Sequence, residues 1–358
     1  MAHQSKLSAR YQNILKATIK HYIATAEPVA SKTLAQEYDF NVSSATIRNI
    51  MGRLEEAGLL YQPHVSAGRV PSDSGYRTYV DHLLIPDDKI NTMVQKLLQQ
   101  ELQLVRASFE ALLQQSAKIL AALSGYIALI TFPQNQNSTL RHLQLVRVAD
   151  NQVMLIVVTD SYQTQSILME SPILDKEADE SIIDHELQLL SNFLDHELKG
   201  RSLTEIVTLD WAEIDRDFAQ YAGFLGILLK QLKLALQTSY SSPIFIHGVA
   251  EFLRQPEFTQ LQQVQTLLSL LEEQQEQLLP AIFTFPAIED SLKRVSIKIG
   301  MENHLEPMRT CTLVSANYYR DDVAVGSVGI LGPKRMLYEN AIALVENTAD
   351  YLSNPFQV

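Results

Sequence analysis

The chain has 358 residues, which is enough for two or three domains of ordinary size. With 46% hydrophobic and 20% charged residues it can form packed cores, and this composition excludes an intrinsically disordered chain. No stretch approaches the ~20 apolar residues that a membrane helix needs, and the first residues lack the apolar core of a secretion signal. The single cysteine, Cys311, excludes a disulfide framework and a cysteine-rich zinc site. We therefore expect a cytoplasmic protein without a membrane partner.

The charge is distributed unevenly along the chain. The formal net charge is −12, yet residues 1–80 hold nine Lys and Arg against six Asp and Glu, a balance of +3. The remaining residues therefore carry −15. A basic end on an acidic body is compatible with one module that faces nucleic acid, although an excess of three charges also arises by chance.

The first 60 residues predict three helices. Apolar side chains recur with a period of 3.6 over residues 8–25, and Pro28 ends that helix. A short helix over residues 32–38 and a tight turn precede a third helix over residues 45–57, which ends at Gly58. This order of elements is typical of a helix-turn-helix.

The third predicted helix has two different faces. Its apolar face, at positions i, i+3, i+4 and i+7, consists of Ile47, Ile50, Met51 and Leu54. The opposite, polar face carries Ser44, Arg48, Asn49 and Arg53. Arginine can bind guanine edges and asparagine can pair with adenine, so this face suits a major groove. Taken alone, it equally suits an ordinary amphipathic helix with a solvated face.

The segment after this helix favours the nucleic-acid interpretation. Residues 59–61 read as a strand, and the loop over residues 62–71 is rich in turn-forming residues. A strand, a basic loop and a return strand after a recognition helix form a wing. We expect Gly68 to allow a tight turn, Arg69 to stand at the loop tip, and His64 to be an exposed loop residue.

Two adjoining stretches resemble the DNA-binding region of the HrcA family of heat-inducible repressors. Residues 42–49 with 54–60 are similar to that family's recognition helix, and residues 64–72 with 75–80 to its wing and exit. Val65 is a mild departure, because the family more often has Thr there. From the residue chemistry we expect groove contacts from Ser44, Thr46, Arg48 and Asn49, and contacts to the DNA backbone from Arg53, Arg69 and Arg77.

The rest of the chain mixes helices and strands. Residues 88–124 predict one long helix that links a DNA-binding head to the remainder. Strands are predicted at 126–132, 142–148, 153–159, 165–169, 295–299, 312–319 and 323–330, with a hairpin turn at Asp150-Asn151. Further helices are predicted over 178–238, 249–280 and 334–352.

A second part of the HrcA resemblance lies near the C-terminus. Residues 299–303 are similar to the family's Ile-Gly-x-Glu-Asn, and residues 326–338 to its Gly-Pro-x-Arg-Met-x-Tyr segment. The resemblance implies an α+β multidomain fold, in which a GAF-like α/β domain carries an inserted, mainly helical dimerisation domain. We place the winged helix-turn-helix at residues 1–85, the GAF-like domain with its linker helix at 86–164 and 241–358, and the insertion at 165–240.

The sequence offers no catalytic constellation, and we expect neither an enzyme nor a cofactor. Gly326, Gly329 and Gly332 lack the spacing of a P-loop or a dinucleotide fingerprint, so we assign them to a strand end and a turn. His185 and His196 lie near carboxylates but form no compact metal motif, and a solvated helix face is the preferred interpretation. Cys311 is expected to be a core thiol.

These patterns lead to one main hypothesis and two rivals. The resemblance implies a homodimeric repressor of chaperone operons that binds an inverted-repeat operator and is kept active by the chaperonin GroEL. The first rival is a metabolite-responsive regulator whose GAF-like domain senses a small ligand, because such folds often hold ligands. The second rival is an enzyme with a winged-helix head, against which the missing catalytic motifs weigh.

Overall fold

The computed structural model describes residues 7–84, 88–102, 109–133, 139–149, 152–159, 164–170, 180–202, 205–206, 226–228, 230, 244–283, 294–320 and 323–353. The chain divides into two compact units, of which one is Met1–Phe132 with Pro243–Val358 and the other is Pro133–Ser242. In the first unit we call residues 7–84 the head, and the described residues of 88–132 and 244–353 the body. The second unit is called the inserted unit. The fold combines helices and sheets, as the α+β expectation requires.

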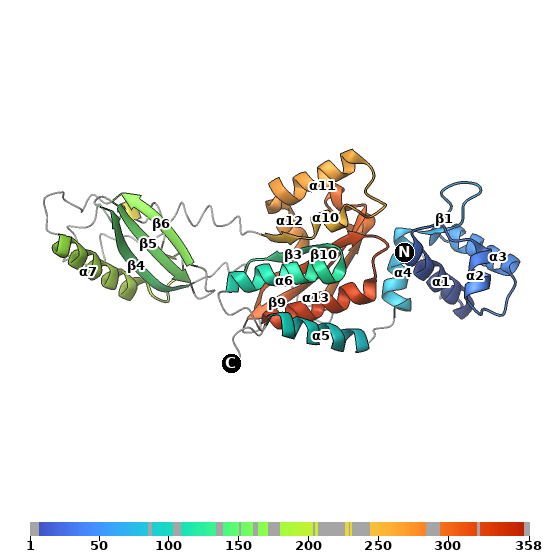
Figure 1. Ribbon diagram of the computed structural model, residues 1–358, viewed down its shortest axis with the longest axis horizontal. Helices are drawn as coiled ribbons and strands as arrows, with labels where there is room; N and C mark the ends of the chain where they lie inside the picture. Colours follow the sequence, from blue (N-terminus) through green and yellow to red (C-terminus); the bar gives the residue numbers. More distant parts are fainter. Residues whose placement is uncertain are drawn as a thin grey trace. The chain divides into compact units, whose positions relative to one another are not determined.

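The head begins with the helices that the sequence predicts, each within one residue of its expected bounds. In chain order its elements are α1 (Ala9–Thr25), α2 (Ser31–Glu37), α3 (Ser44–Glu56), β1 (Leu60–Tyr61), β2 (Val70–Pro71), α4 (Asp73–Thr78) and the π-helical turn η1 (Tyr79–Leu83) (Figure 1). Strands β1 and β2 pair in an antiparallel manner, with Leu60 opposite Pro71. The head core contains the fully buried side chains of Ile14, Leu15, Ile19, Leu34, Ile47 and Leu54.

The described residues of the body form a five-stranded antiparallel sheet in the order β7-β3-β10-β9-β8. Its strands are β3 (Ile127–Thr131), β7 (Ile244–His247), β8 (Val295–Ile299), β9 (Cys311–Arg320) and β10 (Val323–Pro333). Every residue of β3 is buried, because both faces of the sheet are covered. Gly326, Gly329 and Gly332 lie within β10, so the strand interpretation of that glycine run is confirmed.

Helices pack on both faces of this sheet (Figure 1). One face is covered by α6 (Phe109–Ser124) and α13 (Tyr338–Ser353), with α5 (Asp88–Leu102) packed on α13, while α10 (Val249–Phe252), α11 (Leu261–Glu273) and α12 (Gln275–Ile282) cover the other. The short 3-10 turns η4 (Gly300–Glu302) and η5 (Glu306–Met308) connect β8 to β9. Cys311 is fully buried at the start of β9, and this burial raises the pKa of its thiol to about 12, which confirms the expected core thiol.

Two expectations for the body were wrong. A single helix over residues 88–124 is excluded, because α5 and α6 pack against each other and two halves of one straight helix cannot touch. The edge strand β7 was not predicted. It is only four residues long, and the apolar run Ile244-Phe245-Ile246 between Pro243 and Gly248 is the signal that could have revealed it.

The inserted unit begins earlier than the expected boundary at residue 165. Strands β4 (Leu140–Ala149), β5 (Gln152–Thr159) and β6 (Thr164–Glu170) pair only with one another among the described residues, so they do not extend the body sheet. Helix α7 (Glu180–Leu198) packs on one face of their sheet through Leu187, Leu190 and Leu194. The hairpin residues Asp150-Asn151 lie outside the described residues, while Ala149 and Gln152 on either side are paired.

Candidate nucleic-acid interface

Helix α3 is fixed at both ends by local hydrogen bonds. At its start the Ser43 hydroxyl accepts the backbone N–H of Thr46 at 3.2 Å and lies 3.0 Å from the Thr46 hydroxyl. At its end Gly58 adopts a φ of +73°, and the N–H of Leu59 donates to the carbonyl of Leu54 at 2.9 Å. A residue in the left-handed region closes the last turn and satisfies its carbonyl groups.

The two faces of α3 are separated as its periodicity predicts. Its buried side chains are Ile47, Ile50, Met51 and Leu54. The exposed side chains include Ser44, Arg48, Asn49 and Arg53, while Thr46 is half-buried and held by Ser43. Within the described residues Arg48 and Arg53 have no ion-pair partner. The helix therefore presents two free guanidinium groups and one carboxamide to solvent.

Gly52 lies on this exposed side, between Arg48 and Arg53 in the sequence. A Cβ built there meets no atom within 4 Å, and its φ is not positive, so nothing inside the head requires a glycine. Glycine in a helix interior costs about 0.5–1 kcal/mol relative to alanine. The residue leaves the backbone of α3 open to close approach from outside.

The loop between β1 and β2 projects His64, Val65 and Ser66 into solvent, and Val65 is 99% exposed. The Gln62 side chain donates from Nε2 to the carbonyls of Val65 and Ala67, at 2.8 and 2.9 Å, which fixes the loop's shape. The expected exposure of His64 is confirmed.

Arg69 stands at the base of this loop instead of at its tip. Its backbone exchanges hydrogen bonds with Val29, at 2.8 and 2.9 Å, and its guanidinium Nη2 pairs with Glu55 Oε2 at 2.8 Å. Gly68 allows that approach, since a Cβ would collide with the carbonyl oxygens of Pro28 and Val29. Arg69 therefore links the loop to α1–α2 and to the end of α3, and its Nε is buried without a hydrogen-bond partner in the described residues.

Arg77 is engaged with the body. Its Nε donates to Glu302 Oε1 at 2.9 Å and its Nη2 donates to the other oxygen of the same carboxylate. Nη2 also donates to the carbonyl of Ile297 at 2.6 Å, and Nη1 pairs with Asp81 at 3.3 Å. The hydrogen bonds to Glu302 raise the pKa of Arg77, which stays charged at every physiological pH.

The structure thus gathers four of the seven expected DNA-binding residues on the exposed side of α3 and separates Thr46, Arg69 and Arg77 from them. Sequence reasoning did not identify Glu55 and Asp73, which hold Arg69 and the Met301 turn respectively. Glu55 stands two residues after Arg53 and 14 residues before Arg69, so no local pattern in the sequence connects it with Arg69.

The histidine-rich part of α7 has ordinary structural contacts. Asp195 accepts the N–H of Leu143 at 2.7 Å and lies 3.0 Å from the His142 ring, and Asp184 pairs with Arg147 at 2.9 Å. Among the described residues no group of three or more His, Cys, Asp or Glu could hold a metal ion. No helix among all the residues that the structure describes has the length and apolar character needed to cross a bilayer.

The comparisons with known proteins cover nearly the whole chain. The family model of the HrcA protein C terminal domain matches residues 110–342. The heat-inducible transcription repressor HrcA of Cyanothece sp. (strain PCC 7425 / ATCC 29141) is 56% identical over 360 residues, 98% of each chain. The repressor of the same name from Anabaena sp. (strain L31) is 55% identical over 355 residues, 99% of each chain. A crystal structure titled a hypothetical protein has a TM-score of 0.65 at 21% identity, over 97% of this chain and 98% of its own, which indicates a shared fold.

A head with an exposed, cationic helix and these relatives define a transcriptional repressor, a class of protein that binds DNA and is not an enzyme. More particularly, the chain belongs to the HrcA family of heat-inducible transcription repressors.

Proposed function

We propose that the head is a winged helix-turn-helix that inserts α3 into the major groove of an operator. The observation that carries this proposal is the pair of free, exposed arginines on α3, with Asn49 beside Arg48. Arg48 and Asn49 have the donors and acceptors that read base edges, and Ser44 can bind a base or a phosphate. We assign Arg53 to the DNA backbone.

The remaining expected residues receive supporting roles in this proposal. Thr46 completes the cap of α3 through Ser43, and Arg69 holds the loop against Glu55. The loop tip, with His64 and Ser66, would then lie next to the DNA. Arg77 acts on the body and does not touch DNA.

The rest of the molecule is assigned by family membership. The relatives are named heat-inducible repressors, and we propose that this chain represses chaperone operons as a cytoplasmic homodimer on an inverted repeat. In this proposal the body is the GAF-like domain, the inserted unit contributes to dimerisation, and the chaperonin GroEL maintains the active form. Two-fold symmetry then requires half-sites separated by ~10–10.5 bp or a multiple of it.

The ligand-sensor alternative receives no support from the described residues. Apolar side chains fill the space on both faces of the body sheet, with Val314 and Ile330 on one face and Leu313 and Leu331 on the other.

A fluorescence-anisotropy titration tests the proposal. The full chain is titrated on a duplex that carries the inverted repeat of the chaperonin operon, and on a scrambled duplex at the same ~0.15 M salt. Preference for the repeat by ~10³-fold or more is the expected result. Equal, weak binding to both duplexes, with and without added chaperonin, would contradict it.

A further inference from the structure

Side-chain contacts, and not only the connecting chain, join the head to the body. Two charged residues one turn apart on α4, Asp73 and Arg77, face the turn η4 between β8 and β9. Asp73 Oδ2 accepts the N–H of Met301 at 3.0 Å, and Asp73 Oδ1 accepts Lys334 Nζ at 2.6 Å. Gly300, with a φ of +55°, has no Cβ, and a Cβ there would collide with the Asp73 carboxylate.

Arg77 makes the second half of this contact. Its guanidinium meets the Glu302 carboxylate with two parallel hydrogen bonds, and Glu302 Oε2 also accepts the N–H of Ile299 at 2.8 Å. We call Asp73, Arg77, Gly300–Glu302 and Lys334 the clasp. Both body segments of the clasp belong to stretches that resemble the family's C-terminal signatures, so those signatures here serve the attachment of the head.

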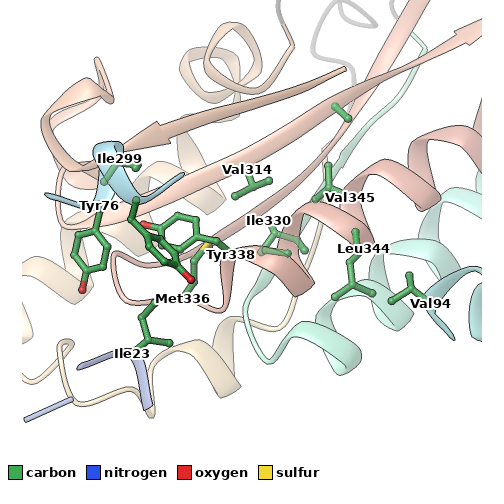
Figure 2. Close-up of a cluster of buried hydrophobic side chains, with 14 of the residues drawn as sticks. Ile23, Tyr76, Val94, Ile299, Val314, Ile330, Met336, Tyr338, Leu344 and Val345 are labelled. Carbon is green, nitrogen blue, oxygen red and sulfur yellow. The ribbon is translucent and has the colours of Figure 1, made fainter. Parts of the chain in front are cut away.

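Next to the clasp lies an apolar centre. The ring centroid of Tyr338 is 6.0 Å from that of Tyr76 and 6.3 Å from that of Tyr79. Ile23, Ile299 and Met336 belong to the same buried cluster (Figure 2). The Tyr79 hydroxyl donates to Glu339 Oε1 at 2.7 Å. A buried aromatic centre with charged groups at its rim is typical of a specific interface.

The clasp contributes orientation more than affinity. Its four charged side chains are between a quarter and two-fifths exposed, and ion pairs of that kind contribute little free energy each. Their signs, however, alternate along α4. A shift of α4 by one turn would set Asp73 against Glu302 or Arg77 against Lys334, and such like-charge contacts disfavour the shifted arrangement.

From this geometry we propose that the clasp fixes the angle at which α3 is presented, and that it thereby sets the half-site spacing the repressor accepts. Asp73 and Arg77 are positioning residues that do not contact DNA. The inference rests on the proposed binding of an inverted repeat by two heads. Heads held rigidly tolerate one spacing, whereas heads released from the body can reach several.

The test compares binding profiles of the full chain. Wild type, Arg77→Ala and Asp73→Asn are titrated on the inverted repeat, on versions with one, two or five base pairs added between the half-sites, and on a single half-site. Arg53→Ala serves as the DNA-contact control and the exposed Arg309→Ala as the neutral control. Unfolding curves of every variant show whether it is folded at the titration temperature.

We expect the affinity of wild type and of Arg309→Ala for the duplex to fall about tenfold or more when the spacing changes, because the half-sites rotate out of phase. Arg77→Ala and Asp73→Asn should bind the single half-site with an affinity within about twofold of wild type. Their affinity should fall by less than about threefold across the spacing series. Arg53→Ala should bind every duplex more weakly, with a salt slope reduced by about one.

Two outcomes would overturn the inference alone, and a third would overturn the proposed function with it. A wild-type spacing profile in Arg77→Ala and Asp73→Asn would show that the clasp does not set the angle. Weaker half-site binding by Arg77→Ala with a reduced salt slope would make Arg77 a phosphate contact. Wild type that does not prefer the repeat to scrambled DNA would overturn the proposed function and the inference together.

Discussion

The side-chain amide of Asn303 donates to the carbonyl oxygen of Cys311 across 3.2 Å, and so ties the turn after β8 to the start of β9. The same nitrogen lies 3.1–3.3 Å from the carbonyl oxygens of Lys298, Gly300 and Met308. Asn303 is buried, and its Oδ1 has no hydrogen-bond partner in the described residues. One carboxamide thus organises the loop that presents Gly300–Glu302 to α4.

Replacement of Asn303 should destabilise the body. Asn303→Ala leaves buried carbonyl groups without a donor, with an expected loss of about 2–3 kcal/mol in the free energy of unfolding. Asn303→Asp places a carboxylate among carbonyl oxygens, and we expect about 3–5 kcal/mol at neutral pH. Urea unfolding measures both, with the exposed neighbour His304→Ala as the control. An Asp variant as stable as wild type at pH 7 would show that the carbonyl cluster does not need the amide.

Glycines of the head should differ sharply in their tolerance of alanine. A Cβ at Gly75 would collide with the carbonyl of Leu59, and one at Gly68 with the carbonyls of Pro28 and Val29. Each change should cost about 2–4 kcal/mol, because backbone atoms must move apart. The matched control is Gly52→Ala, where the new methyl meets nothing, and a gain of about 0.5–1 kcal/mol is expected. Thermal unfolding of the three variants checks this order, and equal effects would contradict it.

Arg48 and Arg53 should fail in different ways. If Arg48 reads a guanine, Arg48→Ala costs about 1–3 kcal/mol on the operator and relaxes specificity at one base pair. Arg53→Ala should weaken binding to every duplex alike. Anisotropy titrations against a set of single-base operator variants separate the two effects. Uniform weakening by Arg48→Ala would reassign that residue to the phosphate backbone.

The stability provided by Glu302 should depend on pH. Burial alone would raise the pKa of its carboxyl, but the hydrogen bonds from Arg77 and from the N–H of Ile299 prevail and lower it below 4.5. A carboxyl whose pKa is lowered by folding stabilises the folded state above its unfolded pKa, and this contribution is lost as the pH falls through the folded pKa. Wild type should therefore be more stable than Glu302→Gln at pH 7, with the difference closing below pH 4.5. A difference that stays constant from pH 7 to pH 3 would show that the charge of Glu302 is irrelevant.

Local patterns were sufficient to predict the three helices of the head. They were not sufficient to predict where the inserted unit begins. The bounds of α1, α2 and α3 follow from apolar spacing and from stop signals such as Pro28 and Gly58, which act within a few residues. Strand pairing depends on distant residues. The two sheets differ in burial: β4 has buried and exposed residues, as a sheet with one covered face requires, whereas β3 is buried throughout. Strands β3, β4 and β5 were all expected in one domain, within residues 86–164.

The candidate site shows the same limit. Exposure of Arg48, Asn49 and Arg53 follows from helix periodicity around Ile47 and Leu54, so a sequence is sufficient to predict it. The partners of Arg69 and Arg77 are set by tertiary structure. Glu302 is 225 positions from Arg77 in the chain, and no local pattern connects them.

The antiparallel pairing of β3 with β7 has a consequence for how the chain could be shortened. Thr131 and Ile244 are directly opposite each other, although 112 residues, 132–243, separate them. Because the segment 132–243, this long excursion from the body sheet, begins and ends at adjacent strands, a tight turn of about four residues could replace it and leave the sheet hydrogen bonds unchanged. Closing so short a connection in place of the long one would cost about 3 kcal/mol less chain entropy. The excursion is therefore a cassette that can be exchanged, trimmed or lengthened without altering the architecture that carries it.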